Sequence, residues 1–247
     1  MFVTTAASGD PEEAEELRRR FGFTVVQRAG RPVHELLRET EPLLVLGKKR
    51  ADLYVGGRSY RATVGMAFLR LLRAKKGEPD PLVTAAGLQP GETVLDCTLG
   101  LGGDALVAAA ATGARVVGLE VNPLLAAFTQ SALRRLPGHG GEPGRRVEVL
   151  HADHRDFLQT SPPFDVVLFD PMFRCKGSAG PLFELLRRHA DHAPLEVASI
   201  DQARRIARRG VLVKDAFPGH ELRRLGLEPR LTRRSAAICF AWIPAQE

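Results

Sequence analysis

The sequence lacks the features that mark membrane-spanning and exported proteins. None of its apolar runs reaches the roughly 20 residues that a helix needs to span a bilayer. The first residues contain no basic segment followed by an apolar stretch, which is the pattern of a secretory signal peptide. We therefore expect a cytoplasmic protein that has no membrane partner.

Cysteine is also scarce. The three cysteines, Cys97, Cys175 and Cys239, are far apart, and no Cys-x-x-Cys pair occurs. This pattern argues against a disulfide framework and against a thiolate zinc site, and it fits a reducing compartment. Two His-Ala-Asp-His tetrapeptides, at 151–154 and 189–192, are better explained as surface and helix-cap residues than as a joint metal site. The sequence predicts no metal.

Positive charge is in excess, with a formal net charge of +6. A basic surface raises the local concentration of a polyanion such as nucleic acid. An arginine-rich surface whose charge only aids solubility would give the same net charge. Candidate contacts with RNA phosphates are Lys48, Lys49, Arg50 and Arg58, together with recurring arginine pairs later in the chain.

The chain divides into two parts at the helix-breaking segment 77–81. Residues 1–80 are expected to form a small α/β subdomain with strands at 2–5, 23–26, 43–46, 51–55 and 59–62 and helices at 11–20 and 65–75. Gly56 and Gly57 predict a tight hairpin turn. In the second helix, Arg70, Arg73, Lys75 and Lys76 are expected to point outward.

Residues 81–247 alternate regularly between strands and helices. Apolar runs at 93–98, 114–120, 147–152, 164–170 and 210–214 are typical of parallel strands that are buried on both faces. The segments 230–234 and 236–242 are expected to add an antiparallel hairpin. The result is an α/β fold of the Rossmann-like type, with the seven-stranded sheet of class I methyltransferases.

A glycine-rich turn follows the first of these strands. Gly100, Gly102 and Gly103 stand where the main chain must turn sharply and lie against a ligand. Asp96 precedes this turn, and Glu120 ends the next strand, where an acid can accept hydrogen bonds from both hydroxyls of a ribose. The segment predicts a nucleoside-containing cofactor at the carboxyl end of the sheet.

Two cofactors fit this spacing, because it also satisfies the dinucleotide fingerprint. A dinucleotide places its pyrophosphate at the helix N-terminus, where Asp104 stands with Asp96 close by in the chain. At an effective dielectric of ~20, a like-charge contact near 4 Å costs about 4 kcal/mol. S-adenosylmethionine (SAM) has no phosphate and carries an ammonium and a sulfonium group, which acids suit. The segment therefore favours SAM.

The strand expected at 164–170 ends in Asp170-Pro171-Met172-Phe173. This is similar to the amino-methyltransferase motif, an acid or amide followed by Pro-Pro-aromatic. The exocyclic amine of a base is a poor nucleophile, because its lone pair is delocalised into the ring. The Asp170 carboxylate and the carbonyl of Pro171 can accept the two amine hydrogens and so orient the lone pair. Phe173 is expected to stack on the base.

Taken together, residues 96–105 and 170–173 resemble the RsmJ family, which methylates guanine N2 in small-subunit ribosomal RNA. The resemblance covers roughly residues 85–215, and residues 1–80 are more similar to an uncharacterised Gram-positive branch of RsmJ-like proteins. It implies a SAM pocket that includes Gly103, Asp104, Glu120, Val121, Asp153, His154 and Asp170. Met172 departs from the family of motifs that have a second proline at this position.

Three functions remain to be distinguished. The first is methylation of a base amine in RNA, with ribosomal RNA as the partner. The second is methylation of a small molecule or of a protein amine, in which case the basic surface would be incidental. The third is a dinucleotide-dependent oxidoreductase or a non-catalytic nucleotide-binding module. The paired motifs favour the first.

Overall fold

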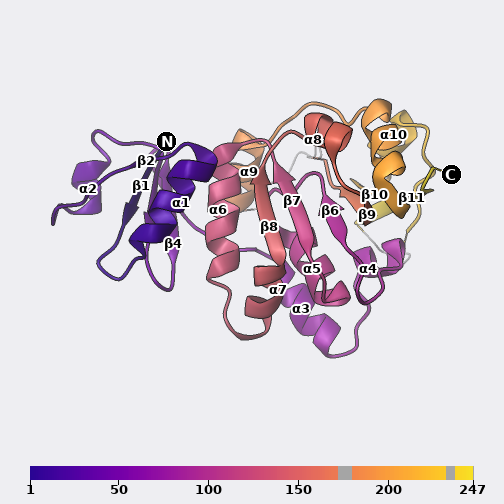
Figure 1. Cartoon of the computed structure of the whole chain (residues 1–247), viewed down its shortest axis with the longest axis horizontal. Helices are drawn as coiled ribbons and strands as arrows, with labels where there is room; N and C mark the ends of the chain where they lie inside the picture. The colour runs from indigo at the N-terminus through magenta and orange to yellow at the C-terminus, as the bar shows by residue number, and fades with distance from the viewer. Residues whose placement is uncertain (172–179, 232–236, 247) are drawn as a thin grey trace.

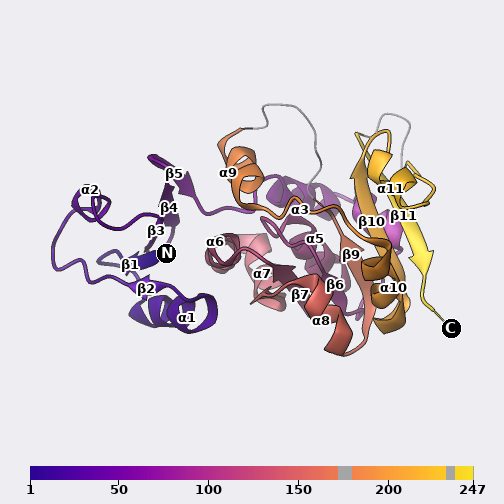
Figure 2. The ribbon, with the colours of Figure 1, turned by 90° about the horizontal axis from the view of Figure 1, so that it is seen from above.

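Two β-sheets, one in each half of the chain, organise the protein (Figure 1). The computed structural model describes residues 1–171, 180–231 and 237–246. Figure 2 shows the N-terminal sheet beside the larger sheet along the long axis of the molecule. Within the described residues, no helix combines the length and the apolar character needed to cross a membrane.

The N-terminal sheet has the strand order β2-β1-β3-β4-β5. Its strands are β1 (Phe2–Thr5), β2 (Thr24–Val25), β3 (Leu43–Leu46), β4 (Ala51–Val55) and β5 (Arg58–Arg61). The predicted hairpin between β4 and β5 is confirmed, and Gly56 and Gly57 both adopt the left-handed conformation that such a turn requires. Two helices pack in this half, the predicted α1 (Pro11–Phe21), whose N-cap is Asp10, and the unpredicted α2 (Val33–Leu36).

The larger sheet has the strand order β11-β10-β9-β6-β7-β8. Its strands are β6 (Val94–Asp96), β7 (Val116–Glu120), β8 (Val147–His151), β9 (Phe164–Phe169), β10 (Ala207–Ala216) and β11 (Ile238–Pro244). The first five run parallel, and β11 is antiparallel to β10 at the edge. This order confirms the predicted Rossmann-like fold.

The predicted hairpin at the end of the chain differs in its pairing. Strand β11 pairs along its length with β10, whereas Arg230 makes only an isolated bridge to Phe240. Residues 232–236, which the prediction assigned to the hairpin, lie outside the described residues. The sheet therefore has six strands in the described part of the chain, where seven were expected.

Helices cover both faces of the larger sheet because its strands are apolar on both sides. In β6, Val94 belongs to one buried cluster and Leu95 to the other, as the alternation of side chains along a strand dictates. The helices of this half are α3 (Ala67–Lys75), α4 (Pro81–Ala86), α5 (Gly103–Thr112), α6 (Pro123–Arg134), η1 (Gly138–Gly140), α7 (Gly141–Arg146), α8 (His154–Thr160), α9 (Pro181–His189), α10 (Val197–Ile206) and α11 (His220–Arg224). Helices α5 and α6 contribute to the first cluster, and α8, α10 and α11 to the second.

A buried ion pair and a shared apolar cluster join the two halves. The guanidinium of Arg135, which follows α6, lies 2.6 Å from the carboxylate of Glu13 in α1, and the two side chains are only 8% and 7% exposed. The first cluster continues from the larger sheet to Leu17 and Phe21 of α1. Helix α3, which precedes the predicted boundary at 77–81, packs against α5.

We expect the loss of this ion pair to destabilise the whole chain. Glu13→Ala leaves the Arg135 guanidinium buried without its carboxylate, which should lower the free energy of unfolding by about 3–5 kcal/mol. Urea denaturation measures this change. Glu15→Ala in the same helix is the matched control, because its pair with Arg18 is exposed and should contribute less than about 1 kcal/mol. Equal effects of the two substitutions would contradict this account.

Candidate active site

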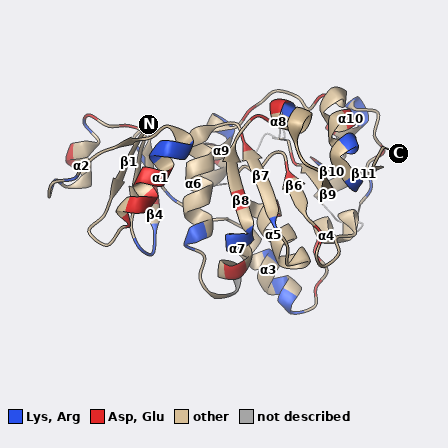
Figure 3. Ribbon diagram, in the orientation of Figure 1, with Lys and Arg blue, Asp and Glu red and all other residues tan. Residues whose placement is uncertain are grey.

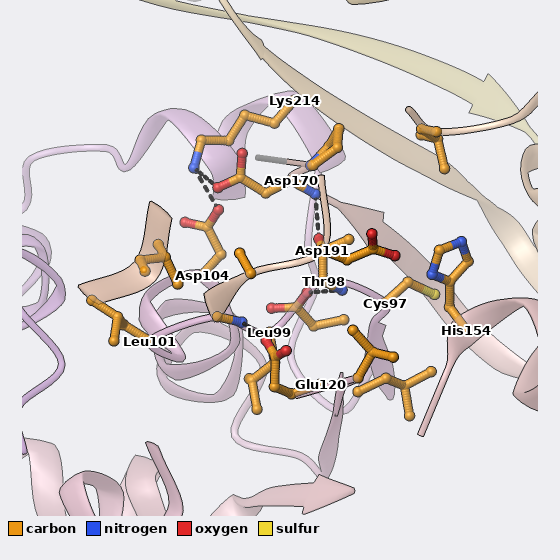
Figure 4. A pocket seen from close by; sticks show the side chains of 18 of the residues that line it. Cys97, Thr98, Leu99, Leu101, Asp104, Glu120, His154, Asp170, Asp191 and Lys214 are labelled. Atoms are coloured by element: carbon orange, nitrogen blue, oxygen red, sulfur yellow. Dashed lines mark hydrogen bonds and ion pairs between the residues drawn. The ribbon is translucent and has the colours of Figure 1, made fainter. Parts of the chain in front are cut away.

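The candidate site lies where the parallel strands of the larger sheet end. Strand order reverses between β6 and β9, and open α/β sheets bind ligands outside such a switch point. A cavity of about 430 Å³ opens there, which is within the range of small-molecule sites (Figure 4). Its lining includes ten of the predicted site residues: Asp96, Gly100, Gly103, Asp104, Glu120, Val121, Asp153, His154, Asp170 and Pro171.

Two predicted site residues are not among those that line the cavity. Gly102 caps α5 with φ +74°, and a Cβ at this position would lie 2.9 Å from the Cγ2 atom of Thr129 in α6. Gly102 therefore allows the close approach of the turn to α6, and its contact with the cofactor stays a prediction. Phe173 lies outside the described residues, as does Met172.

Asp96 and Glu120 are buried acids that accept hydrogen bonds from main-chain N–H groups. The N–H of Thr98 donates to Asp96 Oδ1 at 3.0 Å, and the N–H groups of Gly100 and Asn122 donate to the two oxygens of Glu120 at 3.1 and 2.9 Å. Burial, together with the nearby Asp104 carboxylate, raises the pKa of Asp96 to about 7. Burial also raises the pKa of Glu120. These two acids place negative charge at the ends of β6 and β7.

Asp104 has a different environment from the one that the sequence suggested. The Nζ atom of Lys214 lies 2.7 Å from Asp104 Oδ2, and the guanidinium of Arg70 donates to Oδ1. Burial alone would raise the pKa of Asp104, but these two cations lower it to about 2. The prediction treated Asp104 as an uncompensated charge that complements a cationic cofactor, whereas the structure neutralises it from two sides.

Asp170 follows β9 and faces the same cation. Its N–H donates to Thr98 Oγ1 at 2.6 Å, and its Oδ2 accepts from Lys214 Nζ. Oδ1 is buried and has no hydrogen-bond partner among the described residues. Burial raises the pKa of Asp170 to about 6 despite the neighbouring Lys214. The side chain therefore offers one unused acceptor.

Asp153 and His154 lie at the end of β8. Asp153 accepts from the N–H of Arg155 at 2.9 Å and caps α8, which confirms the helix-cap interpretation of this residue. Its carboxylate also pairs with the Arg155 guanidinium, which in turn reaches Asp191 at 3.2 Å. The ring of His154 packs edge-on against Phe169. Burial lowers the pKa of His154, and its Nε2 atom has no hydrogen-bond partner among the described residues.

Sequence reasoning missed two cations of the site, Arg70 and Lys214. Arg70 was expected to point outward, but it pairs with both Asp80 and Asp104. Lys214 was identified only as the end of a predicted strand. A lysine that ends an otherwise apolar buried strand is the signal that would have pointed to it, because such a cation needs buried partners.

Comparison with known proteins settles the class of the site. The model of the family described as "Putative SAM-dependent methyltransferase" matches residues 37–182, which is more than half of the chain. The chain belongs to this methyltransferase family. SAM is therefore its cofactor, as the glycine-rich turn and the acids around it predicted, and the dinucleotide alternative is set aside.

Similar proteins extend this assignment over almost the whole chain. The "uncharacterized protein YpiP" of Bacillus subtilis is 34% identical over 91% of this chain and 90% of its own length. The ribosomal RNA small subunit methyltransferase J of Alkalilimnicola ehrlichii is 34% identical over 58% of each chain, and that of Coxiella burnetii is 27% identical over 89% of each. The resemblance to RsmJ is confirmed.

A solved structure confirms the fold of this methyltransferase independently. A SAM-dependent methyltransferase of Neisseria gonorrhoeae superposes with a TM-score of 0.67, at 20% sequence identity, over 99% of this chain and 96% of its own. The N-terminal sheet is therefore part of the shared architecture, because the superposition includes almost every residue of this chain.

We expect Glu120 to contribute to SAM binding through its charge. Glu120→Gln keeps the size of the side chain and removes the carboxylate, which should raise the Kd for SAM about tenfold, or about 1.4 kcal/mol. Isothermal titration calorimetry measures this change. The matched control is Glu148→Gln on the neighbouring strand β8, because Glu148 pairs with Arg115 on the surface and does not face the cavity. Unchanged SAM affinity in Glu120→Gln would show that the charge of Glu120 does not contribute to SAM binding.

Proposed function

We propose that this methyltransferase modifies an exocyclic amine of a nucleic-acid base, namely guanine N2 in small-subunit ribosomal RNA. The observation that carries the proposal is the unpartnered, buried Oδ1 atom of Asp170 at the end of β9. Asp170 is held through its N–H by Thr98 and through Oδ2 by Lys214, so Oδ1 is the acceptor that a substrate can use. A free hydrogen-bond acceptor at this position can orient the amine of a substrate for methylation.

The proposed mechanism follows from the two acceptors at this strand end. Asp170 Oδ1 accepts one hydrogen of the substrate amine, and the carbonyl of Pro171 accepts the other. The two hydrogen bonds orient the nitrogen lone pair toward the reacting carbon and stabilise the positive charge that develops on nitrogen. When bound, SAM would supply the methyl group on a sulfonium, with the N–C bond forming as the C–S bond breaks, and the nitrogen would release its surplus proton through the hydrogen bond to Asp170 Oδ1. Phe173 remains a prediction for the stacking of the base.

The cofactor end of the cavity lies on the other side of the strand-order reversal. We propose that Glu120 accepts from the ribose hydroxyls and that Asp96 and Glu120 together favour the cationic end of SAM. Val121 and His154, which line the cavity beside them, are proposed to contact the adenine ring. The neutral His154 offers its unpartnered Nε2 as a polar atom for this contact.

Ribosomal RNA as the substrate is supported by two observations. Relatives that match 58% and 89% of this chain carry the name "ribosomal RNA small subunit methyltransferase J". The net charge of +6 suits a polyanion, and the ribbon of Figure 3 is coloured for Lys and Arg on helices of both halves, including α1, α3 and α10. The proposal implies that the enzyme acts in the cytoplasm, where ribosomal RNA is available.

We further propose that residues 1–80 recognise the substrate. The β4–β5 hairpin reaches α9, where Arg58 pairs with Glu184. Phe183 and Leu186 of the same helix line the cavity. The edge strand β5 is thus in contact with a helix that lines the cavity, and we propose that a bound RNA contacts both halves of the chain. Lys48, Lys49 and Arg50 are further candidates for contacts with phosphates.

The substrate is tested by mass spectrometry of ribosomal RNA nucleosides from cells with and without the gene. We expect N2-methylguanosine to decrease by one residue per small subunit in the cells that lack the gene, and to be restored by a plasmid copy. An unchanged nucleoside profile, together with methyl transfer by the purified enzyme to a small molecule or a protein amine, would replace RNA by that substrate class.

The role of Asp170 is tested by its variants and by the pH dependence of methyl transfer. Asp170→Ala should lower kcat at least about 100-fold, while the Kd for SAM changes much less. Protonation of Asp170 removes the carboxylate that accepts the amine hydrogen. The wild-type kcat should therefore fall as the pH decreases through about 6, the pKa of Asp170. Asp170→Asn should lose this acid limb, because an amide does not titrate.

The matched control for Asp170 is Asp165→Asn at the opposite end of the same strand, where Asp165 pairs with Arg208. This variant should keep both kcat and the acid limb. A fully active Asp170→Ala enzyme would defeat the proposed mechanism.

A further inference from the structure

Five alternating charges connect α4 and α3 to the end of β9. Arg70 binds both oxygens of Asp80, at 2.8 and 2.9 Å, and donates also to Asp104. Asp104 accepts from Lys214, and Lys214 donates in turn to Asp170. Figure 4 shows the ammonium of Lys214 placed between the two carboxylates of Asp104 and Asp170. Each ion pair along the series therefore joins two charges of opposite sign.

Lys214 occupies the critical position in this series because it is the member that reaches Asp170. Its side chain is 16% exposed and that of Asp104 only 9%, so the pair is largely removed from water. A cation in this position needs good hydrogen bonds to offset the cost of its desolvation. Without it, the carboxylates of Asp104 and Asp170 would face each other across a buried space, where like charges repel strongly.

The contact with Lys214 also restricts what Asp170 can do. Oδ2 is occupied by the ammonium, and the main-chain N–H of Asp170 is fixed on Thr98 Oγ1. Lys214 therefore holds one oxygen of the carboxylate and Thr98 holds the main chain of the residue, so Oδ1 is the oxygen that remains for a substrate. An acceptor that is already oriented before the substrate binds lowers the barrier more than one that must be ordered during the reaction.

We infer that Lys214 is a positioning residue for the methyl transfer, which orients the Asp170 carboxylate and keeps it in its ionised form. This inference rests on the proposed role of Asp170 and extends it to a residue on the neighbouring strand. Lys214 acts through Asp170 and does not itself receive the methyl group or touch the amine. Arg70 supports it by balancing the charge of Asp104 from the other side, and Asp80 in turn pairs with Arg70.

The test uses Lys214→Met, which keeps the length of the side chain without its charge, and Lys214→Arg, which keeps the charge. Methyl transfer to small-subunit ribosomal RNA from cells that lack the gene is measured from pH 5 to pH 9, as kcat and as KM for the RNA. Calorimetry gives the Kd for SAM. The matched control is Arg209→Met, which removes an ion pair with Glu92 from the opposite end of the same strand.

For Lys214→Met we expect kcat at pH 7 to fall at least about 10-fold, with KM and the Kd for SAM changed less than about threefold. The acid limb of kcat should move upward by about 1 pH unit or more, because the loss of a neighbouring cation favours the protonated carboxylate. Raising the pH should then restore part of the activity. Lys214→Arg should keep the acid limb at its original position, and Arg209→Met should keep both kcat and the limb.

A second variant replaces Lys214→Met if that variant does not fold. If Lys214→Met is unfolded by thermal denaturation, Lys214→Gln serves in its place, because it keeps a hydrogen-bond donor between the carboxylates without the charge. The same upward shift of the acid limb is expected. An acid limb at the wild-type position in whichever of the two variants folds would overturn the inference, as would an equal loss of kcat in Arg209→Met.

The outcome separates this inference from the proposed function. An inactive Asp170→Ala enzyme beside a Lys214→Met enzyme with the wild-type pH profile leaves the proposed function standing and removes the role of Lys214. A fully active Asp170→Ala enzyme removes both.

Discussion

The polar groups of the cavity depend on the parallel pairing of β6, β7, β9 and β10. Parallel strands end at one edge of a sheet, so Asp96, Glu120, Asp170 and Lys214 meet there although they are distant in the sequence. Because the strand order reverses between β6 and β9, the connections that follow these two strands diverge toward opposite faces of the sheet. This divergence leaves room for a ligand. If any one of these strands shifted by a single residue, its own polar side chain would turn into an apolar layer.

Within this edge the acids fall into two groups that differ in their compensation. Asp96 and Glu120 accept from main-chain N–H groups and keep negative charge at the ends of β6 and β7. Asp104 and Asp170 share the ammonium of Lys214 on the other side. The first group suits a cationic cofactor, and the second holds a hydrogen-bond acceptor in a fixed orientation.

The sequence predicted what local patterns determine. Apolar runs identified all five parallel strands, and glycines and strand-end acids indicated the cavity, because periodicity and turn chemistry act over a few residues. It could not place Arg70 or Lys214, whose partner Asp104 is 34 and 110 residues away in the chain. Nor could it show that Gly102 packs against Thr129, because a glycine that touches a cofactor and one that touches a helix give the same pattern.

The ion pair between Glu13 and Arg135 has a consequence for how this protein can be divided. It lies at the junction of the two halves, and the apolar cluster around Leu17 and Phe21 continues through that junction. In a fragment cut at the predicted boundary, the Arg135 guanidinium would lose its carboxylate partner and an apolar surface would be exposed to water. Such exposed apolar surfaces promote aggregation. The two sheets are therefore expected to fold, and to be expressed, as one unit.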